Sequence, residues 1–223
     1  MDPSVDKPRL AVVFGGRSSE HGVSCLTARE VLGVIDRDKY DVQPIGITRD
    51  GAWVIETADW PDLDHGTLPA VRDGLPAFQW ESLREFDAAF PLLHGPWGED
   101  GTIQGLFEMA ELKYVGAGVL SSAVAMDKPF TKTVFSAAGL PQIPYVTVQP
   151  WQWSAQRDRV VARIKALGLP VFVKPARAGS SSGVMMVEAW DELDAAVTKA
   201  REFDPKVIVE AAARDKRELE CAV

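Results

Sequence analysis

Cysteine is scarce in this 223-residue sequence, and long apolar runs are missing from it. Cys25 and Cys221 stand far apart, without a CxxC motif or a Cys/His cluster, which argues against a structural zinc site. No stretch approaches the ~18 apolar residues that span a bilayer, so membrane contact is not expected. The sequence begins without the apolar core of a secretory signal. We therefore expect a cytoplasmic protein with reduced cysteines.

Basic residues are in the minority, with 24 Lys and Arg against 32 Asp and Glu and a formal net charge of −8. A general nucleic-acid binder needs a basic surface to displace counterions, so nucleic acid is not an expected partner. The apolar share of 46% and the charged share of 25% are ordinary for a globular protein. A chain of this length can bury a core without disulfides or metals.

Apolar strand patterns alternate with helical ones up to Gly118, which favours an α/β domain with a parallel sheet. The Pro/Asp/Gly-rich segment 57–77 is predicted to be a loop. The expected strands are 9–14, 40–47, 52–56, 87–93 and 113–118, and the expected helices are 22–35 and 101–112.

The pattern changes after Gly118, and we expect two domains, 1–123 and 124–223. The second should contain helices at 119–138, 155–167 and 191–203, an extended segment at 140–148, a connection at 149–154, and strands on both sides of 176–183 and at 206–212. The final residues, LECAV, also have a strand pattern.

The loop 176–183, ARAGSSSG, is the strongest local feature of the sequence. Its small residues leave backbone N–H groups free to form an anion-binding concavity. Lys174 precedes this loop, whereas the lysine of a P-loop follows the glycines and opens a helix. The pattern predicts a β-hairpin lid over phosphate groups, with a plain hairpin loop as the alternative.

Two other segments follow an expected strand and precede an expected helix, which is where α/β sheets bind ligands. In FGGRSSEHGVS (14–24), Glu20 could bind a substrate ammonium group, or it could cap the helix together with Ser19. In LLHGPWGEDGT (92–102), His94 could be catalytic or structural.

Taken together, four segments in this order resemble D-alanine–D-alanine ligases of the ATP-grasp superfamily. They are VVFGGRSSEHGVS, PLLHGPWGEDGTIQGLFEMAELKYVGAGVLSSAVAMDK, LGLPVFVKPARAGSSSGV and KVIVEAA…RELE. The resemblance implies an ATP-grasp domain after the α/β domain. It also implies a reaction in which ATP and Mg²⁺ (or Mn²⁺) drive the joining of two D-alanines through an acyl phosphate, for peptidoglycan synthesis.

The resemblance also implies a role for each matching residue. Glu20 would hold the ammonium group of the first D-alanine, and His94 would lie near the carboxylate of that substrate. Ser180 would link to Glu20 and orient the substrates. The implied ATP-binding residues are the phosphate-contacting Lys128 and Lys174, the loop serines Ser180 and Ser181, the adenine-binding Glu210, Ala211 and Ala213, and the ribose-binding Glu218.

This sequence departs from the family pattern in two ways. Ser182 stands at a position that is usually apolar, and the metal ligands and a further domain of the longer relatives have no counterpart. We therefore expect no metal ligands in this chain and no ligation by the 223 residues alone. A ligase that uses D-lactate or D-serine and a non-catalytic nucleotide- or partner-binding protein are the alternatives. A homodimer is a further expectation from the family.

Overall fold

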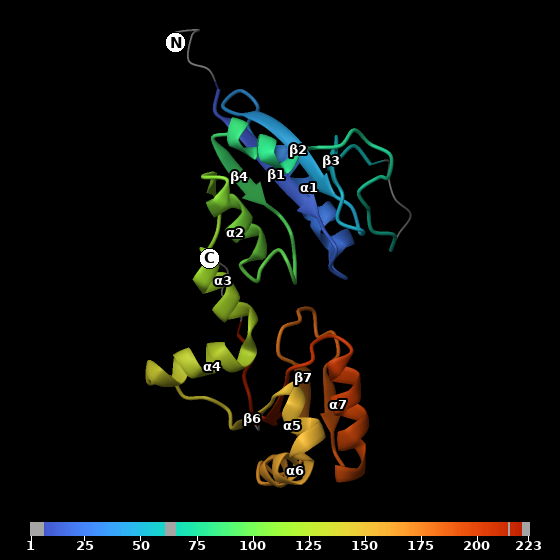
Figure 1. Ribbon diagram of the computed structural model, residues 1–223, viewed down its shortest axis with the longest axis vertical. Helices are drawn as coiled ribbons and strands as arrows, with labels where there is room; N and C mark the ends of the chain where they lie inside the picture. The colour runs from blue at the N-terminus through green and yellow to red at the C-terminus, as the bar shows by residue number, and fades with distance from the viewer. Residues whose placement is uncertain (1–6, 61–65, 214, 220–223) are drawn as a thin grey trace. The chain divides into compact units, whose positions relative to one another are not determined.

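The computed structural model describes residues 7–60, 66–213 and 215–219 (Figure 1). The chain divides into two compact units, Met1–Val124 and Ala125–Val223. Each unit has its own sheet and its own hydrophobic core, and each is therefore described by itself.

The amino-terminal unit contains a five-stranded sheet with the order β3-β2-β1-β4-β5. Its strands are β1 (Arg9–Gly15), β2 (Asp41–Ile47), β3 (Trp53–Ile55), β4 (Ala88–Pro91) and β5 (Lys113–Tyr114). β1 pairs in parallel with β2 and β4, and β4 with β5, which confirms the α/β class. β3 differs from the expected parallel arrangement. It runs antiparallel to β2 because a tight turn, closed by a hydrogen bond from Thr48 N to Ala52 O of 2.9 Å, joins the two strands.

Helices cover both faces of this sheet. They are α1 (His21–Val34), α2 (Thr102–Met109) and the short 3₁₀ helix η1 (Trp80–Glu85). Alternate residues of β1 point to opposite faces, so Val12 packs in a cluster with Cys25 of α1, whereas Val13 packs in a cluster with Phe107 of α2. The result is a three-layer unit that leaves the carboxyl ends of β1 and β4 open to the loops that follow them.

The second unit contains a four-stranded sheet with the order β6-β9-β7-β8, in which every neighbouring pair is antiparallel. The strands are β6 (Tyr145–Val148), β7 (Val171–Pro175), β8 (Met185–Val187) and β9 (Val207–Ala211). The helices are α4 (Lys128–Ala137), α5 (Pro150–Ala155), α6 (Arg157–Lys165), the 3₁₀ helix η2 (Trp190–Glu192) and α7 (Leu193–Arg201), and α3 (Val119–Met126) leads into the unit. The hairpin expected around 176–183 is confirmed, since β7 and β8 pair directly.

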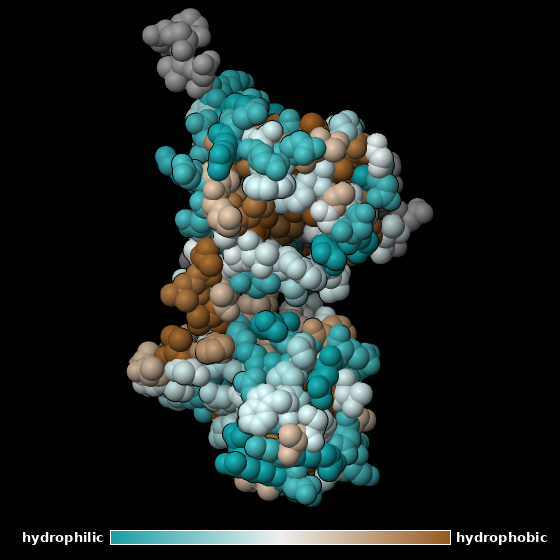
Figure 2. Space-filling model, in the orientation of Figure 1, coloured by the Kyte–Doolittle hydropathy of each residue, from teal (hydrophilic) through white to brown (hydrophobic). Residues whose placement is uncertain are grey.

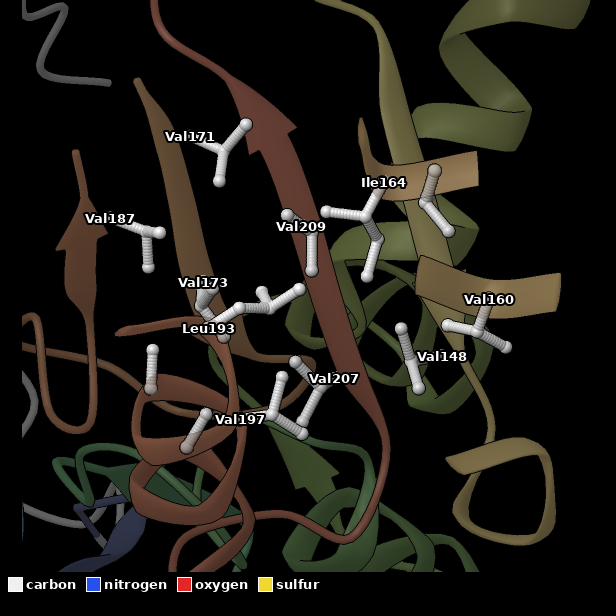
Figure 3. Close-up of a cluster of buried hydrophobic side chains, with 13 residues drawn as sticks. Val148, Val160, Ile164, Val171, Val173, Val187, Leu193, Val197, Val207 and Val209 are labelled. Atoms are coloured by element: carbon white, nitrogen blue, oxygen red, sulfur yellow. The ribbon is translucent and has the colours of Figure 1, made fainter. Parts of the chain in front are cut away.

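Valines fill the core on one face of this second sheet (Figure 3). Val173 of β7 and Val209 of β9 are completely buried there, together with Ile164 of α6. Because side chains alternate along a strand, Lys174 and Glu210 point away from this core. The same alternation that builds the core therefore places two charged side chains on the opposite face, where the candidate site lies.

Two expectations differ from the observed elements. The helical stretch 119–138 is two helices, because Asp127 caps α4 by accepting a hydrogen bond of 3.2 Å from Phe130 N. Residues 149–154 are mostly helix α5 rather than a connection. The Gln152 side chain accepts a hydrogen bond of 3.0 Å from Gln149 N, and proline is well tolerated in the first turn that follows. The strand expected in LECAV falls mainly on residues 220–223, outside the described part.

Hydrophobic side chains gather on the surface over α3 (Figure 2). Leu120 on this helix is 77% exposed. Exposed apolar residues continue on α4 and are Phe130, Val134 and Phe135. Large contiguous apolar patches on a protein surface can be interaction sites.

Candidate functional site

The amino-terminal unit places two loops side by side at the carboxyl ends of β1 and β4. The chain leaves β1 toward β2 on one side and returns to β4 on the other, which makes the β1/β4 edge a topological switch point. Ligands of open α/β sheets bind at such points. Glu20 follows β1 and His94 follows β4, so the topology brings these two predicted residues to the same place.

Serine side chains tie the two loops together. Ser18 Oγ donates to the His94 carbonyl at 2.7 Å and accepts from Glu20 N at 3.1 Å. Deeper in the unit, buried Ser24 donates to the Leu92 carbonyl at 2.7 Å. Sequence reasoning missed both serines as positioning residues, because their partners lie just after β4, more than 60 residues further along the chain.

The imidazole of His94 is oriented by Thr27 of α1. His94 Nε2 lies 3.1 Å from Thr27 Oγ1, and the same hydroxyl lies 3.0 Å from the Val23 carbonyl. The hydroxyl has one hydrogen and donates it to Val23, so an Nε2–H tautomer of His94 satisfies both contacts. This leaves Nδ1 as the ring nitrogen that can face a substrate.

A cavity of about 320 Å³ lies beside this loop pair. Ser18 and His94 line it together with the apolar side chains of Trp53, Trp97 and Leu106. The guanidinium of Arg17, which also lines the cavity, lies 5.7 Å from the centre of the Trp97 ring. A few polar groups at the loops with an apolar wall beside them are typical of small-molecule sites.

The second unit holds a larger cavity of about 740 Å³ between the β7–β8 hairpin and the segment after β9. Eight residues implied to bind ATP line this single cavity: Lys128, Lys174, Ser180, Ser181, Glu210, Ala211, Ala213 and Glu218. Phe172, Ile143 and Met186 add an apolar wall. The sequence of β7 predicts this apolar wall, because Phe172 lies between two core valines and therefore faces away from the core.

The carboxylate of Glu210 is the electrostatic centre of this cavity. It is shared by two lysines, with Lys174 Nζ 2.5 Å from Oε2 and Lys132 Nζ 2.8 Å from Oε1. Burial by itself would raise the pKa of Glu210, but the hydrogen bonds from Lys132 and Lys174 outweigh it and hold that pKa below its ordinary value. Glu210 is therefore a charged acceptor at neutral pH.

Lys128, at the start of α4, reaches the glycine-serine loop. Its ammonium group donates to the Ala178 carbonyl at 2.7 Å, and its backbone N–H donates to the Ala176 carbonyl at 3.0 Å. Burial lowers the pKa of Lys128, and the nearby charge of Lys174 lowers it further. Two cations held this close together favour an anion between them.

The loop itself has a strained tip and an anchored base. Ser180 and Ser181 have φ values of 48° and 56°, which non-glycine residues adopt rarely and at a cost. At the base, the buried carboxylate of Asp204 accepts from Arg177 N, Nε and Nη2 at 2.8–3.0 Å. Sequence reasoning missed Asp204, which lies 27 residues away in a turn that carries no motif.

Glu218 lies at the exposed rim of the cavity and pairs with Lys216. Within the described ranges, no group of three or more His, Cys, Asp or Glu side chains is placed to hold a metal ion. None of the helices in the described part of the chain is long and apolar enough to cross a membrane.

The two units define the class of protein: an α/β domain followed by an ATP-grasp domain with a glycine-serine hairpin over a lysine-lined cavity. A family model described as "D-ala D-ala ligase N-terminus" matches residues 9–117, and one described as "D-ala D-ala ligase C-terminus" matches residues 134–223. The chain belongs to the D-alanine–D-alanine ligase family.

Individual relatives agree with this assignment. The chain is 49% identical to the D-alanine–D-alanine ligase of Paenarthrobacter aurescens, over 99% of this chain and 64% of that protein. It is also 49% identical to the same ligase of Mycobacterium tuberculosis, over 96% of this chain and 62% of the relative. The chain thus spans somewhat less than two thirds of the length of these relatives.

Solved structures show the same fold. The VanG D-Ala:D-Ser ligase of Enterococcus faecalis has a TM-score of 0.75 and 35% identity, and the match covers 94% of this chain and 64% of that one. The D-alanine–D-alanine ligase of Coxiella burnetii has a TM-score of 0.73 and 32% identity, over 93% of this chain and 64% of that one.

Proposed function

We propose that this chain provides the D-alanine-binding domain and a nucleotide-binding lobe of an ATP-dependent D-alanine–D-alanine ligase that serves peptidoglycan synthesis. The observation that carries the proposal is the cavity in which Lys128, Lys174 and Glu210 converge beneath the glycine-serine loop. Relatives that match nearly the whole chain bear this ligase's name and support it. Dependence on ATP assigns the reaction to the cytoplasm.

In this reaction the terminal phosphoryl group of ATP passes to the carboxylate of one D-alanine, and the amine of a second D-alanine displaces phosphate. Lys128 and Lys174 would neutralise the negative charge of the nucleotide phosphates. The hairpin loop would shield the acyl phosphate from water. Magnesium or manganese would neutralise further negative charge on the phosphates in the proposed reaction.

The proposed substrate roles follow the same division. Glu20 would pair with the ammonium group of the first D-alanine, and His94 would meet its carboxylate. Ser180 and Ser181 would contact phosphate from the loop, whereas Glu210, Ala211 and Ala213 would contact adenine and Glu218 ribose. The domain division at residue 123 and the homodimer remain predictions.

Nucleotide binding by the 223-residue chain is the first test, because it does not require turnover. Lys174→Ala should weaken ATP binding by about 2–4 kcal/mol, the cost of losing one buried charge partner. Lys199→Ala is a matched control, since Lys199 pairs with Glu202 on the exposed surface. Unchanged ATP affinity in Lys174→Ala would exclude the phosphate role.

Ligation itself is measured as D-alanine-dependent ADP release with ATP and Mg²⁺. Such release by the 223 residues alone would contradict the expectation that they do not ligate. In the active ligase, Glu20→Gln should chiefly raise the KM for the first D-alanine.

The same assay distinguishes a second candidate, since one structural neighbour is a D-Ala:D-Ser ligase. If D-serine or D-lactate is used in preference to D-alanine as the second substrate, the protein is a ligase of that second kind.

A further inference from the structure

Lys132, on α4, is a charged residue for which the proposed ATP site has no role so far. Its ammonium group lies 2.8 Å from Glu210 Oε1, and its side chain is only 14% exposed. Lys132 does not line the 740 Å³ cavity, whereas Glu210 and Lys174 both do. The carboxylate of Glu210 is thus held by one lysine inside the cavity and by another behind it.

The two lysines differ in how accessible they are to a nucleotide that enters the cavity. A phosphate group in the cavity can compete with Glu210 for Lys174, which lies on the cavity wall. Lys132 is less accessible to the same phosphate, because it does not line the cavity and its side chain is only 14% exposed. Lys132 therefore remains with Glu210 after Lys174 has turned to the phosphate.

We propose that Lys132 is a positioning residue that keeps Glu210 ionised and its Oε2 oxygen aimed into the cavity, so that the site selects a 6-aminopurine over a 6-oxopurine. This inference rests on the proposed ATP-binding function and specifies how that site reads the base. The ionised carboxylate only accepts hydrogen bonds, so it pairs with the amino group of adenine and repels the carbonyl oxygen of hypoxanthine.

The neighbourhood of Lys132 supports a fixed position. Its ammonium group lies 5.2 Å from the centre of the Tyr145 ring, within the range of a cation–π contact. Tyr145 of β6 is the register partner of Glu210 on β9. The sheet pairing therefore holds both contacts of Lys132 at one place, independently of any ligand.

Removing Lys132 has a specific chemical consequence. When phosphate draws Lys174 away, Glu210 would be a buried carboxylate with neither of its two hydrogen-bonded lysines, and burial favours its protonated form. A protonated carboxyl group can donate to a 6-oxo group as well as accept from a 6-amino group. Discrimination between the two bases should then fall, even if total affinity changes little.

The experiment measures the dissociation constants of ADP and IDP for the 223-residue chain by calorimetry. The ratio Kd(IDP)/Kd(ADP) should be at least about 10 in the unmodified chain, because a site built around a hydrogen bond rejects the mismatched group strongly. Lys132→Met should lower this ratio at least threefold, whereas Lys132→Arg should keep it. Lys199→Met, which removes an exposed surface lysine, should leave the ratio unchanged.

The outcomes distinguish the role of Lys132 from the proposed ATP-binding function. A folded Lys132→Met variant with an unchanged ratio would overturn the role of Lys132 and leave the ATP site standing. Absence of ADP binding by the unmodified chain would overturn both. If Lys132→Met does not fold, the ratio of dissociation constants is compared between Glu210→Gln and the double variant Glu210→Gln/Lys132→Met. The double variant has neutral side chains at both positions and so avoids an unpaired buried charge. In that background Lys132→Met should not alter the ratio, and a further change would contradict the proposal.

Discussion

The carboxylate of Glu20 occupies the space into which a side chain on Gly95 would project. Gly95 has a φ of 73°, and its N–H donates to Glu99 Oε2 at 2.7 Å. The loop of residues 94–96 therefore presents its backbone, rather than a side chain, to Glu20. This contact brings together the two loops of the proposed D-alanine site.

Gly95→Ala should displace the Glu20 carboxylate. The added methyl group meets the flexible end of the glutamate, so the substitution moves that end rather than the backbone. Stability should fall by about 1 kcal/mol because of the positive φ. Gly74→Ala is the matched control, with a φ of 76° and no heavy atom within 4 Å of the added carbon. Urea unfolding should show similar losses in both variants, whereas D-alanine binding should weaken only in Gly95→Ala. Equal D-alanine affinity in the two variants would contradict the displacement.

The Asp204–Arg177 anchor should dominate the stability of the loop base. Asp204 is 2% exposed and accepts four hydrogen bonds, three from Arg177 and one of 2.9 Å from Lys206 N. Asp204→Asn should cost about 2–3 kcal/mol, because hydrogen bonds to a charged acceptor are lost in a buried place. Asp194→Asn breaks an Arg–Asp pair whose side chains are about half exposed, and its cost should stay below about 1 kcal/mol. Comparable losses in urea unfolding would show that Asp204 is not an anchor.

His21 should make stability depend on pH below neutrality. Its ring is fully buried, with Nδ1 2.6 Å from the Gly16 carbonyl and Nε2 accepting from Val71 N at 3.0 Å. Burial lowers the pKa of His21, so the unfolded chain takes up a proton there at a higher pH than the folded one does. The contribution of neutral His21 to stability is therefore fully present above the pKa of histidine in the unfolded chain, about 6.5. It falls as the pH drops below that value, by up to about 1.4 kcal/mol per pH unit.

The measurement is the free energy of unfolding between pH 7.5 and 5.5. His21→Gln lacks the titrating ring, so its stability should change less over this interval than that of the unmodified chain. Parallel curves for the two proteins would exclude His21 as the source of the slope.

Local patterns predicted the strands and the loops at their ends, in which Glu20 and His94 lie. That both residues serve one substrate was implied by the family resemblance, and the parallel strands place the two loops at the same edge of the sheet. The pairing of Lys132 with Glu210 could not be predicted, because it depends on how α4 packs against β9, whose Glu210 lies 78 residues later in the chain. Asp204 and α5 were missed for related reasons: a turn aspartate carries no motif, and a six-residue helix is shorter than the periodicity that reveals helices.

Cys25 should report when α1 separates from its sheet. The thiol is fully buried among Val12, Phe14 and other apolar residues, and burial raises its pKa to about 12. At pH 8 only about one thiol in 10⁴ would be ionised even if the reagent could reach it. In a Cys221→Ser variant, Cys25 is the sole thiol, and Ellman's reagent should react at least about 100-fold more slowly in native buffer than in urea. Because the reactive thiolate forms only after the helix opens, the native rate should follow the stability of the amino-terminal unit and rise in His21→Gln. Rapid labelling in native buffer would show that Cys25 is accessible without opening of the helix.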